Sequence, residues 1–332
     1  MKPVLNNTAI AITITSTFAS AAIAMSALVH AQTYPTKPIR VISNSASGSP
    51  GDIALRLVAP RISASVGQPV VVETKAGAGG QIAAQDVLRA GPDGYSIMYS
   101  TNMIISSKYL LKNVTVDVQR DFAPVSMAAR VTNLVAVHNS VPGNTLREFV
   151  DYAKKNPGKV SISSNGIGSS LHLQWIGFMQ STGTDLTHIP YGSGNEGLRN
   201  NDFLTGRIGA TLIPYSSIRQ AVEAKQVRIL AVLGESRYKR LPETPALGEV
   251  ISDYKFTLGF WGFFAPAATP APIVTRLSEE IQKGFRDPDI AAKLEALDTE
   301  PSTSSPRDFA AAIKIFDTNV AALVKAAGLT PQ

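Results

Sequence analysis

The strongest constraint on the fold is the regular alternation of short β-branched runs with helical segments after residue 33. In the helical segments, apolar residues recur at every third or fourth position, as Leu55, Val58 and Ile62 do. Strands that alternate with helices favour α/β layers built around mostly parallel strands. At 332 residues, the chain is long enough for two domains of this kind.

This alternation predicts where each element lies. Strands are expected over residues 38–42, 70–72, 96–100, 160–163, 188–189, 207–213 and 227–233. Helices are expected over residues 51–65, 81–89, 145–155, 170–180, 196–204, 218–224, 273–285, 290–297 and 308–327. Pro60 lies inside the first helix and should kink or shorten it.

Two apolar runs are longer than an ordinary strand and predict crossings between domains. They cover residues 123–137 and 256–266, whereas a typical strand has about five or six residues. If both cross, residues 32–130 and 259–332 form a discontinuous first domain and residues 131–258 an inserted second one. Two crossing strands make a hinge, and the cleft between two such α/β lobes is where open sheets bind ligands.

Residues 1–31 differ in composition from the rest and predict a cleavable secretory signal. Lys2 precedes a run rich in Ala, Ile, Thr and Ser, which ends at Val29-His30-Ala31. A membrane anchor is the alternative, but hydroxyl residues dilute the apolar run and no basic cluster follows it. We therefore expect a soluble periplasmic protein that begins near Gln32.

Composition argues against several kinds of site. The chain has no cysteine and four histidines, which leaves no thiolate chemistry and no His-rich metal site. Its formal net charge of +6 is scattered rather than gathered in a stripe, which argues against nucleic-acid binding. The weak positive field favours anionic ligands. We expect a monomer without metal or cofactor.

The loop over residues 43–52 is the first candidate ligand site. It joins a strand to a helix, and free N–H groups at such a helix start bind a carboxylate or phosphate without a basic side chain. The alternative is a capped loop with no ligand. Its spacing matches neither a P-loop nor the dinucleotide glycine pattern. The ligand residues that we select here are Ser43, Asn44, Ser47, Gly48, Ser49 and Asp52.

A second loop, over residues 163–170, repeats this chemistry in the other predicted lobe. Two facing helix starts suit a ligand with two carboxylates, or with one carboxylate and a polar tail. The selected residues are Asn165, Gly166, Gly168, Ser169 and Ser170. The glycines of residues 77–80 also precede a helix, and they either line the ligand or only provide turn geometry and close packing.

Further polar residues follow predicted strands. Thr101 and Asn102 follow one strand and Tyr191 follows another, so all three are candidates for the same ligand. We expect Trp175 and Phe178 in the core. In the returning strand, one of Phe260 and Trp261 should face the core and the other the cleft.

An enzyme is the weaker alternative. The chain has no Gly-x-Ser-x-Gly elbow and no His-Glu-x-x-His motif. His172 lies two residues after Ser170 and would serve its hydroxyl in a periplasmic Ser/His hydrolase. A histidine at a helix start is more often structural.

At these loops the sequence closely resembles the Bug receptors, the substrate-binding proteins of tripartite tricarboxylate transporters. The resemblance runs from Tyr34 to Gly328. It rests on an ordered set of segments, namely residues 34–40, 48–56, 70–73, 77–80, 92–95, 101–102, 121–126, 168–173, 190–191 and 263–266.

The resemblance implies a periplasmic-binding-protein fold that captures small carboxylates and delivers them to membrane permease subunits. In some members the partner is instead a membrane sensor. The family's ligand loops fall on residues 43–52, 101–102, 166–170 and 191–194. Beside the loops we also select His172 and Ile213 as ligand residues.

Departures from the family pattern bear on the ligand. The first loop has Asn44 to Ser47 where relatives are rich in Pro and Phe, and Gly192 stands where they carry Lys. Gly209 and Ile213 stand where relatives often have Asp. Losing an acid at Ile213 disfavours an ammonium group, so we predict a ligand without one.

Overall fold

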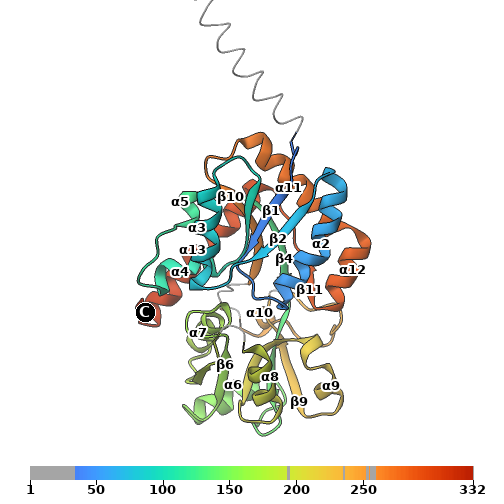
Figure 1. Cartoon of the computed structure of the whole chain (residues 1–332). Coiled ribbons are helices and arrows are strands. Elements are labelled where there is room, and N and C mark those ends of the chain that lie inside the picture. Colours follow the sequence, from blue (N-terminus) through green and yellow to red (C-terminus); the bar gives the residue numbers. More distant parts are fainter. Residues whose placement is uncertain (1–33, 193–194, 235, 252–253, 255–258, 332) are drawn as a thin grey trace, which may run out of the picture.

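The chain is described here by a computed structural model that covers residues 34–192, 195–234, 236–251, 254 and 259–331. The predicted signal, residues 1–31, lies outside the described residues. The strands form a six-stranded sheet in the order β11-β4-β10-β3-β1-β2 and a five-stranded sheet in the order β7-β6-β8-β5-β9. Each sheet with its helices is called a lobe below, and Figure 1 shows the first lobe above the second.

The first lobe contains both ends of the described chain. Its strands are β1 (Ile39–Ser43), β2 (Val70–Thr74), β3 (Ser96–Thr101), β4 (Phe122–Val131), β10 (Phe260–Pro266) and β11 (Thr299–Pro301). Its helices are α2 (Pro50–Val66), η1 (Ala78–Gly80), α3 (Gln81–Ala90), α4 (Met103–Leu110), α5 (Val118–Asp121), α11 (Ala271–Arg286), α12 (Pro288–Ala296) and α13 (Pro306–Ala326).

The second lobe is formed by the middle of the chain. Its strands are β5 (Asn133–His138), β6 (Ser161–Ser164), β7 (Thr187–Pro190), β8 (Ala210–Pro214) and β9 (Val227–Val232). Its helices are α6 (Leu146–Lys155), α7 (Ser170–Thr182), α8 (Glu196–Leu204), η2 (Tyr215–Ser217), α9 (Arg219–Glu223) and α10 (Leu247–Val250). The two lobes confirm the predicted α/β class.

Two sequence-based predictions about these elements are wrong, and one helix was missed. Helix α2 continues through Pro60 to Val66 because Pro60 is exposed, so water can satisfy the carbonyl that loses its donor. The run over residues 123–137 is not one strand but two, β4 and β5, divided at Thr132. Helix α4 was not predicted, because its hydroxyl residues Ser106 and Ser107 weaken the apolar pattern.

The sheets are also less parallel than expected. β1 pairs in parallel with β2 and β3, and β6 pairs in parallel with β7 and β8. However, β10 is antiparallel to β3 and β4, and β5 is antiparallel to β8 and β9. A chain that leaves a lobe on one strand and returns on another must run in opposite directions, which explains the mixture.

The connection between the lobes runs from β4 directly into β5, and the returning strand β10 lies between β3 and β4. The segment before β10 includes residues 255–258, which lie outside the described residues. The domain boundaries at Arg130 and Gly259 stay a prediction. Among the described residues, no helix combines the length and the apolar character needed to cross a membrane.

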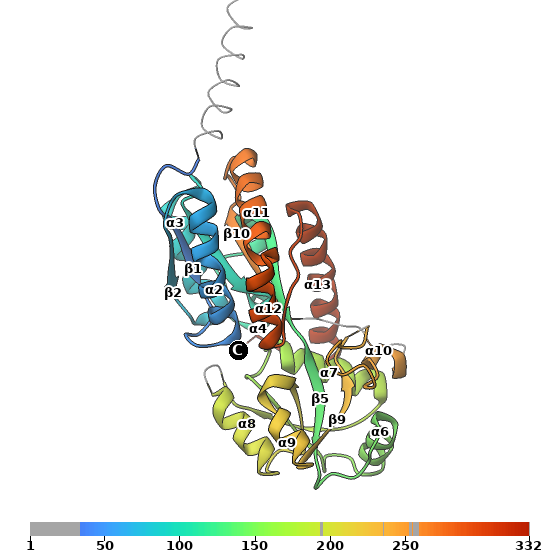
Figure 2. The ribbon, with the colours of Figure 1, turned by 90° about the vertical axis from the view of Figure 1, so that its right-hand side faces the viewer.

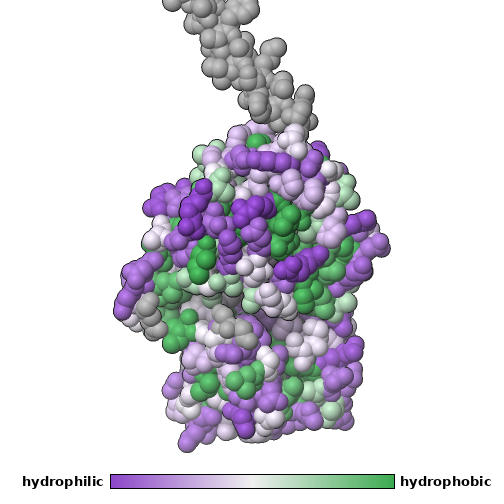
Figure 3. All heavy atoms as spheres, viewed as in Figure 1, coloured by the Kyte–Doolittle hydropathy of each residue, from purple (hydrophilic) through white to green (hydrophobic). Residues whose placement is uncertain are grey.

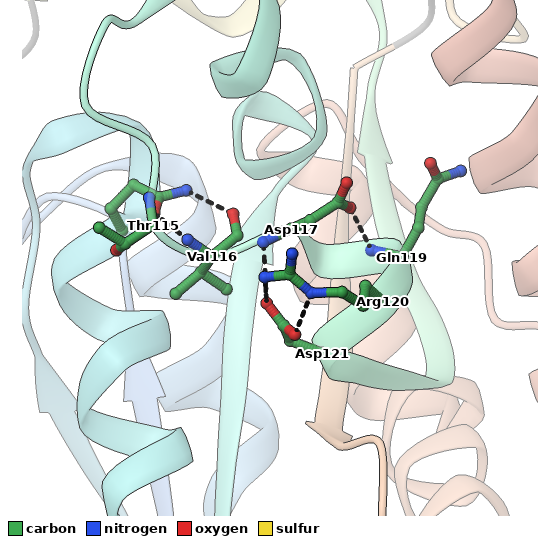
Figure 4. A network of polar contacts seen from close by, with 7 residues as sticks. Thr115, Val116, Asp117, Gln119, Arg120 and Asp121 are labelled. Atoms are coloured by element: carbon green, nitrogen blue, oxygen red, sulfur yellow. Dashed lines mark hydrogen bonds and ion pairs between the residues drawn. The ribbon is translucent and has the colours of Figure 1, made fainter.

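The turn that leads into β4 is fixed by polar contacts, which Figure 4 shows. Gln81 Oε1 accepts from the Val116 amide at 2.9 Å, and its Nε2 donates to the Val116 carbonyl at 3.0 Å. Asp121 Oδ2 accepts from the Asp117 amide at 2.9 Å. These contacts anchor the N-terminal end of the strand that crosses toward the second lobe.

Helix α7 packs against both lobes. Trp175 and Phe178 are buried in the core of the second lobe, as predicted. Leu173 and Ile176 belong instead to an apolar cluster with residues of α4 and α13 in the first lobe. The helix is therefore part of the interface on which the lobes meet.

Candidate functional site

The candidate site consists of two turns, one at the start of α2 and one at the start of α7. Each turn has a glycine with positive φ, Gly48 at 77° and Gly168 at 75°. A serine N-cap follows in each, Ser49 (φ −70°, ψ 160°) and Ser169 (φ −63°, ψ 159°). The two lobes thus present their helix starts with the same backbone geometry.

In the first turn, Asp52 holds the loop closed. Its Oδ2 accepts from the Gly48 amide at 3.0 Å, and Arg56 Nε donates to it at 3.0 Å. Ser49 Oγ accepts from the Asp52 amide at 3.4 Å. Burial of Asp52 opposes its ionisation, but the hydrogen bonds from Arg56 and Gly48 outweigh burial and lower the pKa of this carboxyl.

In the second turn, a histidine occupies the equivalent position. His172 Nδ1 accepts from the Gly168 amide at 2.9 Å, and Ser169 Oγ accepts from the His172 amide at 3.3 Å. The ring of His172 stacks on that of His188, with centroids 4.0 Å apart. Burial, together with His188, lowers the pKa of His172 from 6.5 to about 4, so the imidazole is neutral near pH 7.

Several amides of the two turns point to no acceptor. In the first turn, the amides of Ala46, Ser47 and Gly51 make no hydrogen bond to any described residue. In the second turn, the same holds for the amides of Ser170 and Leu171. Unpaired N–H groups at the positive end of a helix favour an anion.

The strand β10 brings the two turns together. A Cβ built on Gly259, just before β10, would lie 3.3 Å from Ser170 Oγ. A Cβ built on Gly51 would lie 2.7 Å from Cε2 of Trp261, two residues further along. Since a strand rises about 3.3 Å per residue, one short segment contacts both helix starts.

The space-filling view agrees with a shared cleft. The face in Figure 3 is hollowed between the two lobes, and the residues around the hollow are mostly pale, of intermediate hydropathy. In Figure 2, the loop before α2 lies above the start of α8, on the side of the crossing strands opposite α10 and α13.

The end of β3 adjoins the first turn. Asn44 Oδ1 accepts from the Thr101 amide at 3.1 Å, and the Asn102 amide donates to the Phe260 carbonyl at 3.1 Å. The side chain of Asn102 is buried and makes no hydrogen bond to a described residue. A Cβ on Gly80 would lie 2.6 Å from Asn44 Nδ2, so the glycine at this position provides close packing.

Other predicted residues lie within the framework of the turns. Ser43 Oγ accepts from the Ser45 amide at 3.1 Å, and Ser47 is exposed. Asn165 Oδ1 is buried without a partner among the described residues, whereas its Nδ2 donates to Glu196 at 3.4 Å. A Cβ on Gly166 would lie 3.6 Å from Gly192 Cα, which places the loop after β7 beside the second turn.

Two predicted residues direct their side chains into the second lobe. Tyr191 donates its hydroxyl to Asp202 Oδ2 at 2.7 Å, and burial and this bond raise the pKa of Tyr191 to about 12. Ile213 is fully buried and packs in an apolar cluster around Phe203. The neighbouring Ser193 and Gly194 lie outside the described residues.

The hydrolase geometry is not formed among these contacts. Ser170 Oγ accepts from Gln174 Nε2 at 3.1 Å, and His172 Nδ1 is occupied by the Gly168 amide. A general base must hydrogen-bond the nucleophile that it activates. Among the described residues, no group of three His, Asp or Glu side chains is arranged to hold a metal ion.

A group of polar contacts between the lobes, centred on Asp298 and called the tie below, lies where α12, α13 and the segment after β9 meet. A cavity lies beside it. Asp298, with a fully buried side chain, accepts from Tyr238 Oη at 2.6 Å and from Arg240 Nη1 at 2.8 Å. The tie therefore joins the first lobe to the second. A cavity of about 870 Å³ lined by Arg130, Arg240 and Asp298 adjoins it, and none of the turn residues lines that cavity.

Sequence reasoning selected most of the first turn but left out Ser45. Phe260 is buried and Trp261 is part exposed, which confirms that one of the two faces the core. The oxygen of Ser45 is buried and has no partner among the described residues. The pattern of small residues did not distinguish Ser45 from its neighbours, because the distinction comes from contact with Gly51.

Comparison with known proteins finds one matching family model, the receptor of the tripartite tricarboxylate transporter family, over residues 54–329. The UPF0065 protein in the tcbD-tcbE intergenic region of Pseudomonas sp. strain P51 is 31% identical over 274 residues, 82% of this chain and 81% of that protein.

Two solved structures are also similar over most of the chain. R. palustris Rpa4515 with adipate has a TM-score of 0.77 and 28% identity, and the match covers 90% of this chain and 100% of that one. The periplasmic binding protein BugD has a TM-score of 0.74 and 30% identity, with the same coverage of each chain.

Proposed function

The chain belongs to the tripartite tricarboxylate transporter receptor family, and from this membership we propose that it is a periplasmic receptor for a small organic carboxylate. Its partners would be the membrane permease subunits of such a transporter, to which it would deliver the ligand. The paired helix starts of the two lobes carry the proposal.

The turns supply what an organic anion needs. Unpaired amides of Ser47 and Gly51 in one lobe, and of Ser170 and Leu171 in the other, offer donors without a basic side chain. Amide donors at helix starts stabilise a carboxylate through hydrogen bonds and the helix macrodipole. A ligand with two carboxylates would engage one turn with each end.

The ligand that we propose is a dicarboxylate without an ammonium group. Rpa4515 binds adipate, a linear dicarboxylate, which supports this class for the present chain. The acid of the first turn, Asp52, is already paired with Arg56 at 3.0 Å. It is therefore not left unpaired to neutralise an amino group.

Capture would proceed by closure of the lobes about their crossing strands. Closure brings amides from both sides onto one ligand and excludes water, which strengthens each hydrogen bond. We infer reversible binding without chemistry, since Ser170 and His172 are each engaged elsewhere. A ligand recovered by heat denaturation after long incubation should be chemically unchanged by NMR.

Titration calorimetry and thermal unfolding with a matched ligand pair test this function. We expect adipate to bind and to raise the unfolding midpoint by mass action. Glutamate and aspartate, which carry an added ammonium group, should leave it unchanged. Tight binding of either amino acid, or binding of no organic acid in a panel from four to eight carbons, would overturn the proposal.

A further inference from the structure

Asp298, at the centre of the tie, has a backbone conformation that glycine usually adopts. Its φ is 54°, and among the described residues only two others that are not glycine have a positive φ. Aspartate tolerates the left-handed region better than most residues, but still at a cost. Strain of this kind persists only where the surrounding contacts hold it, and it points to a role for the residue.

The backbone of Asp298 is fixed to the point where the chain crosses between the lobes. Its carbonyl accepts from the Thr132 amide at 3.1 Å, and its amide donates to the Glu295 carbonyl at 3.0 Å. Thr132 divides β4 from β5, and the next residue, Thr299, pairs with Val131 at the end of β4. Asp298 therefore belongs to the first lobe and lies at the pivot between the two.

The side chain of Asp298 contacts the second lobe through donors from two separate segments. Besides Tyr238 and Arg240, which follow β9, the amide of Ser216 in η2 donates to the carboxylate. The guanidinium of Arg240 lies 5.3 Å from the centre of the Tyr215 ring, which helps to fix its orientation. Burial and the bond to Asp298 raise the pKa of Tyr238 to about 12, so its hydroxyl remains a donor near pH 7.

The tie lies on the side of the crossing strands away from the ligand turns. β11, which follows Asp298, is at one edge of the first sheet, whereas the first turn follows β1 near the other edge. β9 is likewise at one edge of the second sheet, and the second turn follows β6 near the opposite one. The tie therefore does not contact a ligand held by the turns, and it acts on binding only through the arrangement of the lobes.

The structure shows the lobes in a closed arrangement. A Cβ on Gly168 would lie 2.6 Å from Leu110 Cδ1, so the second turn already contacts the first lobe. Leu173 and Ile176 of α7 also pack in the apolar cluster of the first lobe. Further closure on the ligand side would make these groups overlap, so the motion that remains is opening.

We propose that Asp298 is a positioning residue, whose carboxylate holds the lobes closed and so sets the ligand affinity without contacting the ligand. Opening turns the second lobe about the crossing strands and displaces all three donors relative to Asp298. Hydrogen bonds weaken steeply with misalignment, so the open arrangement loses the tie. Apparent affinity scales with the fraction of molecules in the binding-competent arrangement. The proposal rests on the proposed function for its ligand, whereas the balance between open and closed lobes exists without one.

The Asp298→Asn variant tests the carboxylate. Asparagine also tolerates the left-handed conformation, and the bond from Thr132 to the backbone carbonyl is kept. One amide oxygen cannot accept from all three donors, and its NH₂ group adds donors where acceptors are needed. By calorimetry, adipate affinity should fall roughly tenfold, as expected for lost hydrogen bonds to a charged group. Tyr238→Phe removes one of the three bonds and should lower the affinity by about threefold.

Glu249→Gln is the matched control. Glu249 accepts from Arg237 Nη2 at 2.8 Å, and both partners belong to the second lobe. The variant removes one carboxylate from an ion pair close to the tie but breaks no contact between lobes. It should bind adipate as the wild type does, even where its unfolding midpoint falls.

Distances between spin labels report the arrangement of the lobes without ligand. The chain has no cysteine, so exposed Ala64 in α2 and Asn201 in α8 can be replaced by cysteine and labelled selectively. Both helices lie on the ligand side of the crossing strands in Figure 2, so opening lengthens the distance between the labels. In double electron–electron resonance, Asp298→Asn should shift the ligand-free population to longer distances than the wild type and Glu249→Gln show. Adipate should restore the shorter distance.

The outcomes separate this inference from the proposed function. If Asp298→Asn binds adipate as tightly as the wild type, or more weakly without a change in the label distances, the role of Asp298 is wrong while the receptor function stands. Tighter binding by Asp298→Asn would also overturn it, because the tie would then stabilise the open arrangement. If the wild type binds no carboxylate, the proposed function fails, and the ligand-free distances still decide whether Asp298 holds the lobes closed.

Discussion

The two lobes start their ligand-facing helices with the same hydrogen bonds but different side chains. Ser49 and Ser169 each donate their own amide three residues back, and each Oγ caps the amide three residues ahead. The residue at that position then accepts from the preceding glycine amide. In the first lobe this residue is Asp52, and in the second lobe it is His172.

The comparison separates the features of the turn that the backbone conformation sets from those that the side chains set. A left-handed glycine followed by a serine cap produces the geometry in both lobes, as the nearly equal angles of Gly48 and Gly168 show. The position three residues after the serine, which is Asp52 or His172, needs only a hydrogen-bond acceptor. A carboxylate paired with Arg56 and a neutral imidazole both meet that need, but they respond differently to pH.

Among the changes that would sharpen this comparison, alanine at Gly48 or Gly168 is expected to have the largest effect on stability. Both have positive φ, which costs about 1 kcal/mol for alanine. A Cβ on Gly48 would meet nothing within 4 Å, whereas one on Gly168 would lie 2.6 Å from Leu110 Cδ1 of the first lobe. We expect Gly48→Ala to destabilise by about 1 kcal/mol and Gly168→Ala by about 3 kcal/mol in urea unfolding.

The double variant Gly168→Ala/Leu110→Ala separates backbone strain from contact between lobes. Removing the Leu110 side chain should relieve the overlap, so the two changes should couple by more than about 1 kcal/mol. Strict additivity would contradict a clash. It would also mean that the second turn approaches the first lobe less closely than Gly168 and Leu110 indicate.

The next effect is a difference in pH response. His172 has a pKa of about 4 in the folded protein, against 6.5 in the unfolded chain, because burial and His188 disfavour its charge. Its contribution to stability is therefore complete above pH 6.5 and is lost as the pH falls toward 4. We expect a loss of about 2 kcal/mol, less than the full shift implies, since the imidazole keeps some contact with water.

Hydrogen exchange of the backbone amides measures this pH response separately in each lobe. Protonated His172 cannot accept from Gly168, so the Gly168 amide should exchange faster between pH 6.5 and 4, after correction for intrinsic rates. The Gly48 amide should stay protected there, because the lowered pKa of Asp52 delays its loss to below the ordinary carboxyl range. His172→Asn keeps an acceptor that does not titrate and should flatten the response. Equal loss of protection in both turns would count against the assignment.

The sequence predicted the backbone part of this comparison well. Gly and Ser at the ends of β1 and β6 indicated helix starts, because few residues adopt left-handed φ or cap an N-terminus. The α/β class followed from the alternation of strands and helices, and the long apolar run over residues 123–137 indicated a crossing but not its division into β4 and β5. The strand directions did not follow from the alternation, because parallel and antiparallel strands share one side-chain period.

The side-chain contacts of the turns could not be predicted from the sequence. Asp52 was selected as a ligand residue, but its carboxylate closes its own turn by accepting from Gly48. His172 stacks on His188, which follows it by a helix and a loop, and no periodic pattern relates them. The contact of Trp261 with Gly51 is likewise tertiary. Local rules describe neighbours along the chain, and these three cases depend on neighbours in space.

A third prediction concerns the first residue of each helix, which is Pro50 in α2 and Ser170 in α7. Proline has no N–H and is favoured at this position. Ser169 already has a ψ of 159°, which suits a following proline. Ser170→Pro should therefore fold normally, lose the Ser170 amide as a ligand donor, and bind adipate about tenfold more weakly by calorimetry.

Ser170→Ala is the matched control, because it keeps the amide and removes only the hydroxyl that accepts from Gln174. It should bind adipate within about twofold of the wild type. If the two variants lose affinity equally, the hydroxyl rather than the amide contacts the ligand. In that case the lobes differ in how they bind, and the resemblance between their turns is only structural.

The smallest effect tests whether the ion pair of the first turn matters at all. Arg56 is about half exposed and donates to Asp52 at 3.0 Å, and exposed pairs of this kind contribute about 0–1 kcal/mol. Arg56→Gln should lower stability by about 0.5 kcal/mol. It also leaves the charge of Asp52 unpaired beside the anion, so adipate affinity should fall two- to threefold at low salt and less at 0.5 M salt. The second turn has His172, and no carboxylate, at the position equivalent to Asp52. If Arg56→Gln binds adipate as tightly as the wild type at both salt concentrations, the charge of Asp52 does not affect the ligand. Asp52 would then be as neutral toward the ligand as His172.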